Sequence, residues 1–273
     1  MSMFFNILSM GGVTYDADYQ AYLDYLTTNS LAHPSTAKKT VENAFMIAVK
    51  SAFSQSTISA CPILQMLMFK TDAASGASLV NWHNPGTYTA TAVNSPTFTS
   101  DLGWNSNGTT SYITGGVTNA SITQTNFTIL VRAHTDGQNN GVITGFGDRD
   151  VNTQAENFNI TPRNTSDVLT FQAISSSGTN ITVANTNGLA RIAIGRTDGS
   201  NVHSSLNGAA FTSTVNSVNA QEISRDMVLL AYNGLSGIVS YFTNGVSYRI
   251  ITTRKLTDAE VAAVDAALVN YLA

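Results

Sequence analysis

The apolar positions divide the chain into a helical first part and a longer part with a β pattern. Residues 16–30 carry apolar side chains at helical spacing behind Asp16, a residue type that caps helix N-termini. Residues 35–53 show the same spacing behind Ser35, so we predict two amphipathic helices. The run CPILQMLMF at 61–69 is too short and too evenly apolar for its periodicity to distinguish a buried helix from a buried strand.

From Tyr88 onward, the pattern changes to eleven short alternating runs separated by turn residues. Asn-Gly, Asp-Gly and Ser-Gly pairs recur between the runs, and such pairs supply the positive φ angles that tight hairpins need. Alternation of this kind at close spacing is typical of antiparallel sheets. We therefore predict a mainly β fold, an antiparallel two-sheet jelly-roll sandwich.

A last helix is predicted at 257–272. Thr257 and Glu260 have the spacing of a capping box there, and the apolar residues that follow share one helix face. The predicted organisation is therefore a helical N-terminal segment over 1–70, which serves docking or oligomerisation, and a sandwich over 71–273 that closes with this helix.

The stretch from Asn81 to Trp104 holds both tryptophans, a histidine and two prolines but almost no charge. Its prolines fall at two predicted turns, 84–86 and 94–96, where proline is tolerated. We interpret this stretch chiefly as the entry of the chain into the first strands.

Composition narrows the possible partners. Charged residues form 11% of the 273 residues, where about 25% is usual, and the net charge is −4. Since no basic patch occurs, we predict no nucleic-acid partner. The one cysteine, Cys61, leaves no disulfide framework. The apolar N-terminus lacks a basic region, and no apolar run approaches the roughly 20 residues that span a bilayer, so we predict cytoplasmic synthesis and no membrane partner.

Several short motifs occur in an order that carries a family likeness. They are the entry NPGTY…SPTFT…NGTTSYI, the hairpin at Asn207-Gly208, and a closing strand that leads into LTDAEV. In this order the chain, from about Asp72 to its C-terminus, resembles the concanavalin A-like, laminin-G-like jelly rolls found in tailed-bacteriophage virion proteins. The resemblance implies a structural or receptor-facing role in a virion, with glycan binding common among such folds.

The sequence offers only one weak candidate for the pair of carboxylates that glycoside hydrolysis requires. That chemistry needs two carboxyl groups about 5 Å apart, or somewhat more for inversion of configuration. Glu222 and Asp226 would share one face of a strand, but Arg225 lies between them and no third acid follows. Motifs of serine nucleophiles and nucleotide sites are missing from the sequence as well. We therefore predict that the protein is not an enzyme.

Three oxygen-bearing side chains at alternate positions, Asp148, Asp150 and Asn152, fall on a predicted turn. Such spacing suits Ca²⁺, which prefers oxygen ligands. The alternative is a solvent-exposed hairpin capped by its own Asx turns. We predict no cofactor, and calcium is the one metal for which the sequence offers candidate ligands.

Aromatic side chains offer a route to sugar binding because a ring face can stack on the apolar face of a pyranose. The candidates for glycan contact are Trp82, Trp104, Tyr88 and Tyr112, which have Asn and Thr residues nearby. The alternative is that these large rings lie in the core, where they bury much apolar area.

We predict a non-enzymatic bacteriophage virion protein: a capsid decoration protein, a head fibre or a tail-associated adhesin. Its partners would be other virion proteins and sister subunits in a homo-oligomer, with host-surface glycan as a further ligand. Two alternatives stay open. One is a carbohydrate-binding module of a secreted or cell-surface protein, and the other is a polysaccharide depolymerase.

Overall fold

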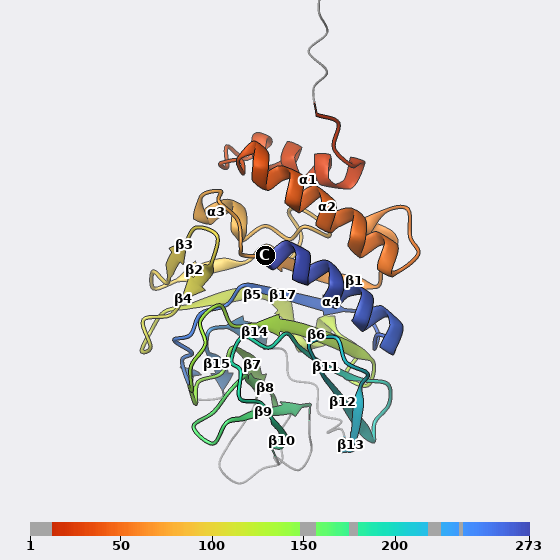
Figure 1. Ribbon diagram of the computed structural model, residues 1–273. Helices are drawn as coiled ribbons and strands as arrows, with labels where there is room; N and C mark the ends of the chain where they lie inside the picture. The colour runs from red at the N-terminus through yellow and green to blue at the C-terminus, as the bar shows by residue number, and fades with distance from the viewer. Residues whose placement is uncertain (1–12, 148–156, 175–179, 218–224, 235–236) are drawn as a thin grey trace, which may run out of the picture.

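A computed structural model describes residues 13–147, 157–174, 180–217, 225–234 and 237–273. Two packed β-sheets form the body of the molecule, and the helices gather at one side of it (Figure 1). The predicted fold class is confirmed, because the sheets are mainly antiparallel and are accompanied by N-terminal helices and a C-terminal helix.

The first sheet has six strands in the order β1-β17-β6-β11-β12-β13, and every neighbouring pair is antiparallel. Its strands are β1 (Ile63–Met68), β6 (Phe127–Arg132), β11 (Ile192–Arg196), β12 (Asn201–Leu206), β13 (Thr212–Val215) and β17 (Tyr248–Thr252).

The second sheet has nine strands, with the path β10-β9-β8-β7-β14-β5-β2 and with β15 and β16 attached beside β7. They are β2 (Thr91–Val93), β5 (Tyr112–Thr118), β7 (Thr144–Gly147), β8 (Asn157–Thr161), β9 (Val168–Ala173), β10 (Ile181–Ala184), β14 (Asp226–Leu229), β15 (Tyr232–Gly234) and β16 (Gly237–Val239). A small separate hairpin pairs β3 (Thr97–Thr99) with β4 (Gly103–Asn105).

The three long helices begin where the sequence predicts them. They are α1 (Ala17–Thr28), α2 (Thr36–Ala52) and α4 (Asp258–Leu272), and short turns form α3 (Ser75–Ser78), η1 (Ile58–Ala60) and η2 (Asn119–Ser121). The side chains of Asp16 and Ser35 cap α1 and α2, and Thr257 with Glu260 completes the capping box of α4. Each cap satisfies backbone N–H groups that a helix start leaves unpaired.

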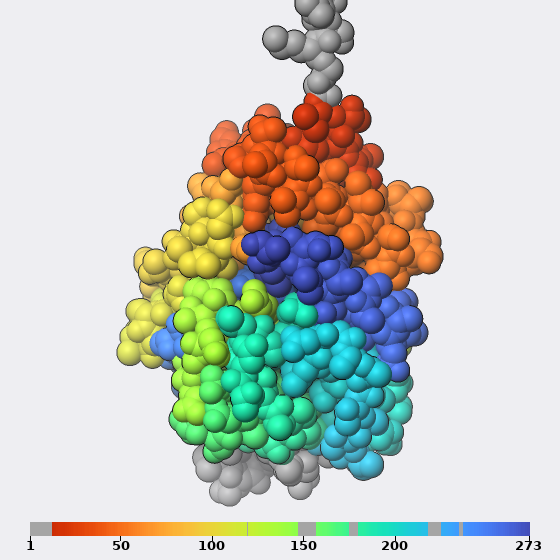
Figure 2. All heavy atoms as spheres, viewed as in Figure 1, coloured from red at the N-terminus to blue at the C-terminus, as the bar shows by residue number. Residues whose placement is uncertain are grey.

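Two apolar cores hold three layers together. One core fills the space between the sheets and includes Phe127, Phe146 and Phe158. The other joins α1, α2 and α4 to the outer face of the six-stranded sheet, to which Leu130 and Ile250 belong. Figure 2 shows α4 against α2 on this side of the molecule. The helices therefore cover one sheet, while the outer face of the nine-stranded sheet has no helix over it in the described chain.

The run 61–69, whose type the sequence left open, contains strand β1, which pairs with β17. The six-stranded sheet thus begins upstream of residue 70, inside the segment predicted to be helical. The docking role assigned to 1–70 stays a prediction. Among the described helices, none is both long and apolar enough to cross a membrane.

The stretch from Asn81 to Trp104 enters the fold much as expected, through β2, β3 and β4. A turn at 84–86 is closed by a hydrogen bond of 3.0 Å from the backbone N–H of Thr87 to the carbonyl of Asn84. Asn81 is buried, and its Oδ1 accepts a hydrogen bond of 2.8 Å from the backbone N–H of Met66. The polar residue that opens the stretch therefore anchors this entry to β1.

Candidate functional site

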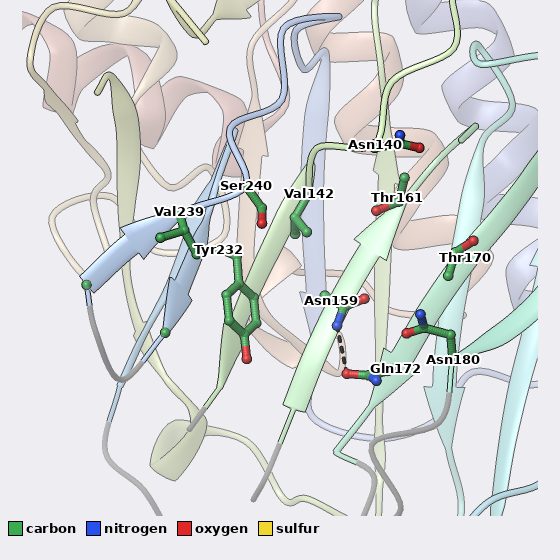
Figure 3. Close-up of a pocket in the computed structure, with 12 residues that line it drawn as sticks. Asn140, Val142, Asn159, Thr161, Thr170, Gln172, Asn180, Tyr232, Val239 and Ser240 are labelled. Carbon is green, nitrogen blue, oxygen red and sulfur yellow. Dashed lines mark hydrogen bonds between the residues drawn. The ribbon is translucent and has the colours of Figure 1, made fainter. Parts of the chain in front are cut away.

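A cavity of about 390 Å³ opens on the outer face of the nine-stranded sheet (Figure 3). This volume lies within the range of about 300–1,000 Å³ that is usual for small-molecule sites. Strands β8, β9, β15 and β16 and their neighbouring loops form it. The lining residues are Asn140, Val142, Asn159, Thr161, Thr170, Gln172, Asn180, Tyr232, Gly234, Gly237, Val239 and Ser240.

Strand alternation places the polar side chains of β8 and β9 in this cavity. Phe158 and Ile160 of β8 point into the core between the sheets, and so do Leu169 and Phe171 of β9. Successive side chains of a strand point to opposite faces, so the residues between them face outward. These outward residues are Asn159 and Thr161 on β8 and Thr170 and Gln172 on β9.

The outward residues lie in cross-strand pairs. In the antiparallel register of β8 and β9, Asn159 is opposite Gln172 and Thr161 is opposite Thr170. Asn159 Nδ2 donates a hydrogen bond of 2.9 Å to Gln172 Oε1, which fixes how the two amides face each other (Figure 3). Gln172 is only 2% exposed. The centre of the cavity therefore carries an ordered amide pair in place of mobile surface chains.

An apolar wall faces the amides. Tyr232 projects from β15, beside Val142 and Val239 (Figure 3). Its hydroxyl donates to Asn157 Oδ1, and the side chain is 8% exposed. Gly145 of β7 makes room for the ring, because a Cβ atom at that position would lie 3.0 Å from Tyr232 Cδ2 and 2.8 Å from the carbonyl oxygen of Phe158.

The lining residues that the structure describes are all uncharged. Nearby charge is already paired: Arg163 Nε lies 2.8 Å from Asp167 Oδ1, and its Nη1 lies 3.1 Å from Asp136 Oδ1. Within the described ranges, no group of three or more His, Cys, Asp or Glu side chains could hold a metal ion. The arrangement is thus suited to hydrogen bonding and ring contact with an uncharged ligand.

A second hollow, of about 290 Å³, lies between α2 and α4 on the helix-covered side. Its residues are mostly apolar: Thr40, Val41, Ala44, Phe45, Ala48, Ala267, Asn270 and Tyr271. Specific small-molecule sites combine apolar walls with several convergent polar groups. This groove offers few such groups, so the cavity on the open sheet is the stronger candidate.

The tryptophans proposed for glycan contact are buried. Trp82 is 1% exposed, and its ring centroid lies 5.0 Å from that of Tyr22 in the core beneath the helices. Trp104 is 3% exposed, and its Nε1 donates a hydrogen bond of 2.9 Å to Ser78 Oγ. A pyranose cannot reach either ring face without displacing these neighbours. Both tryptophans are therefore core residues, as the alternative to glycan contact predicted.

The two tyrosines of that prediction, Tyr88 and Tyr112, are half-buried, and neither lines the cavity. Glycan contact at these residues stays a prediction. The aromatic residue that does line the cavity is Tyr232, which sequence reasoning missed because its run, MVLLAYNG, reads as an ordinary buried strand.

The predicted calcium ligands Asp148, Asp150 and Asn152 lie outside the described residues, as does Glu222 of the carboxylate pair. Asp226 opens strand β14 and is paired in register with Thr118 of β5. Calcium binding therefore stays a prediction.

Comparison with known proteins gives likenesses of fold alone, since no protein-family model and no curated protein matches this chain. Trypanosoma rangeli sialidase in complex with the inhibitor DANA has 12% identity and a TM-score of 0.55, over 83% of this chain and 38% of that one. A mutant of the same sialidase that displays trans-sialidase activity has 10% identity and a TM-score of 0.55, over 92% and 39%. The chain thus spans about two fifths of these sialidase chains.

The CBM40 of Ruminococcus gnavus IT-sialidase, bound to alpha2,6 sialyllactose, matches with 11% identity and a TM-score of 0.40, over 51% of this chain and 82% of that one.

The prediction of a non-enzymatic bacteriophage virion protein is wrong. The solved structures that match with a TM-score above 0.5 include several of Trypanosoma rangeli sialidase, one of them in complex with sialic acid. The prediction that the chain is not an enzyme is contradicted by the same finding, because these fold relatives are sialidases; at 10–12% identity the likeness shows a shared fold and assigns no activity to this chain. The alternative of a carbohydrate-binding module agrees better with them. Virion location and sister-subunit partners stay untested predictions.

Proposed function

We propose that this chain is a carbohydrate-binding module whose binding site is the cavity on the outer face of the nine-stranded sheet. The observation that carries the proposal is the ordered amide pair of Asn159 and Gln172, which faces an apolar wall that includes Tyr232. Sugars present the same combination, a polar rim of hydroxyl groups around apolar C–H faces.

Hydrogen-bonding capacity supports this ligand class. A hydroxyl group both donates and accepts, and a carboxamide side chain offers two N–H donors and one carbonyl acceptor. Asn140, Asn159, Gln172 and Asn180 bring four carboxamides to one cavity. Such a set is suited to a ligand with several adjacent hydroxyl groups, while Val142, Val239 and the tyrosine ring supply apolar contact.

The fold relatives support the same ligand class. Sialidases with sialic-acid ligands share the fold of this chain, although the likeness at 10–12% identity does not extend to the residues of a site. Since function resides in the site and not in the fold, binding rests on the cavity itself.

A glycan array with labelled protein tests the proposal. Gln172→Ala and Asn159→Ala should each lose most of the signal. Gln20→Ala and Asn29→Ala, which change exposed residues of α1 and its C-cap, are matched controls and should keep it. Absence of binding to every glycan, or equal binding by Gln172→Ala and the unaltered chain, would contradict the proposed site. Release of sugar that the cavity variants lose would instead make the cavity a hydrolytic site.

A further inference from the structure

Every hydrogen-bonding side chain in the described lining of the cavity is neutral. Carboxamides and hydroxyls supply donors and acceptors in similar number. An uncharged sugar hydroxyl can use either kind, whereas a carboxylate only accepts. A carboxylate in this cavity would therefore meet amide and hydroxyl oxygens that it cannot use.

Among the described residues, the two arginines near the cavity have other partners. Arg163 is held between Asp136 and Asp167. Arg225 Nη1 donates a hydrogen bond of 2.9 Å to the carbonyl oxygen of Gly234, so this guanidinium supports the backbone of the cavity wall. Recruiting either arginine for an acidic ligand would break these contacts.

Desolvation adds to the discrimination. A charge that is moved out of water without an opposite charge loses far more hydration free energy than a hydroxyl group does. At the floor of the cavity Gln172 is 2% exposed, while its partner Asn159 is half-buried. The net charge of −4 gives a general field that also repels anions.

We propose that this cavity selects uncharged saccharides with vicinal hydroxyl groups and discriminates against acidic ones, both uronic acids and sialic acid. The inference rests on the proposed carbohydrate-binding function and specifies its ligand class. The chain would then differ in ligand charge from the sialidases that share its fold, which are seen with sialic acid and its analogues.

Matched ligands test the selectivity by isothermal titration calorimetry. The probes are the methyl glycosides of glucose, galactose and mannose, each beside the uronic acid that differs only at C6, together with N-acetylneuraminic acid. We expect at least one neutral glycoside to bind and its uronic acid to bind roughly tenfold more weakly, which corresponds to about 1.4 kcal/mol. The affinity for the neutral sugar should change by less than about twofold between 50 and 500 mM salt, because no ion pair is screened.

A charge introduced into the cavity provides the second arm. Thr170→Arg should raise the affinity for the uronic acid by roughly tenfold, as a charge-assisted hydrogen bond is expected to do, and Thr170→Gln should not. Tighter binding of the acid than of its neutral partner by the unaltered chain would overturn the inference and leave carbohydrate binding intact. If neither member of any pair bound, and the glycan array were also silent, the proposed function itself would fail.

Discussion

The two outer faces of this sandwich differ in what covers them. Helices α1, α2 and α4 cover the outer face of the six-stranded sheet, whereas the outer face of the nine-stranded sheet carries the polar cavity. The strands reflect the difference. Strand β6 (FTILVR) is buried at five successive positions, and β8 (NFNIT) alternates its buried Phe158 and Ile160 with Asn157, Asn159 and Thr161.

A strand that is covered on both faces reads as a continuous apolar run, and a strand with one uncovered face alternates. Side chains on the uncovered face do not have to pack against a helical layer, so they can be polar and can contact a ligand. We therefore expect substitutions beneath the helices to affect mainly stability, and substitutions on the open face of the nine-stranded sheet to affect mainly ligand binding.

The largest effect on stability is expected beneath the helices. Trp82→Ala removes a ring that is 1% exposed and lies within 5.0 Å of Tyr22 and 6.1 Å of Tyr271, measured between ring centroids. Truncation of such a ring should lower the free energy of unfolding by about 3–5 kcal/mol. Urea denaturation followed by circular dichroism measures it. A loss below about 1 kcal/mol would mean that the helical layer contributes little to folding.

The next effect depends on pH, through Glu42 in the same layer. This carboxyl group is fully buried and accepts a hydrogen bond of 2.7 Å from the hydroxyl of Tyr19. Burial raises the pKa of Glu42 from 4.5 to about 7, against the opposing effects of the Tyr19 hydrogen bond and the Lys38 charge. The folded state therefore holds a proton that the unfolded state releases between these two pH values.

The contribution of Glu42 to stability is fully present below pH 4.5 and declines as the pH rises to about 7, by up to about 3 kcal/mol. Glu42→Gln, which cannot ionise, should flatten this part of the stability–pH curve relative to the unaltered chain. Parallel curves for the two proteins would show that Glu42 does not titrate in this range.

A smaller effect is expected where α4 begins. Thr257 accepts a hydrogen bond of 3.2 Å from the backbone N–H of Glu260, and the Glu260 carboxylate accepts one of 2.8 Å from the backbone N–H of Thr257. Thr257→Ala should cost about 1 kcal/mol, the typical value for loss of an N-cap side chain. Thr257→Ser keeps the hydroxyl and should recover most of it, which thermal unfolding can measure.

The smallest effect on stability belongs to the open sheet. Thr170→Val removes one hydroxyl from the cavity at nearly constant volume, together with the 3.1 Å hydrogen bond from Asn164 Nδ2. We expect a stability change of about 1 kcal/mol or less but a clear loss of glycan affinity. If stability fell as much as in Trp82→Ala, the separation of roles between the two sheets would be wrong.

Sequence patterns predicted the elements more completely than the site. The caps at Asp16, Ser35 and Thr257 and the alternating runs are local signals, and local signals identified the helices and most strands. The cavity depends on how β8, β9 and β15 come together, and Tyr232 lies some sixty residues from Gln172 in the chain. Only the alternation of Asn, Thr and Gln with apolar residues in β8 and β9 could have indicated an uncovered polar face.

The aromatic candidates show why the sequence pointed to the wrong residues for the binding site. Ring size and polar neighbours favoured Trp82 and Trp104, but large rings are also the most effective core residues, and the structure buries both. The family likeness supplied the sandwich correctly, and the virion role attached to it was wrong, because one fold serves many unrelated functions.

The most direct test is a nuclear magnetic resonance titration of the ¹⁵N-labelled chain with the methyl glycoside that binds most tightly in the calorimetric series. We expect amide shift changes concentrated in 157–172, 232–234 and 237–240, around the cavity of the nine-stranded sheet. We expect little change in 40–48 and 267–271, which include the residues that line the groove between α2 and α4. Shifts confined to that groove, or spread evenly over both sheets, would contradict the assignment of recognition to the open face.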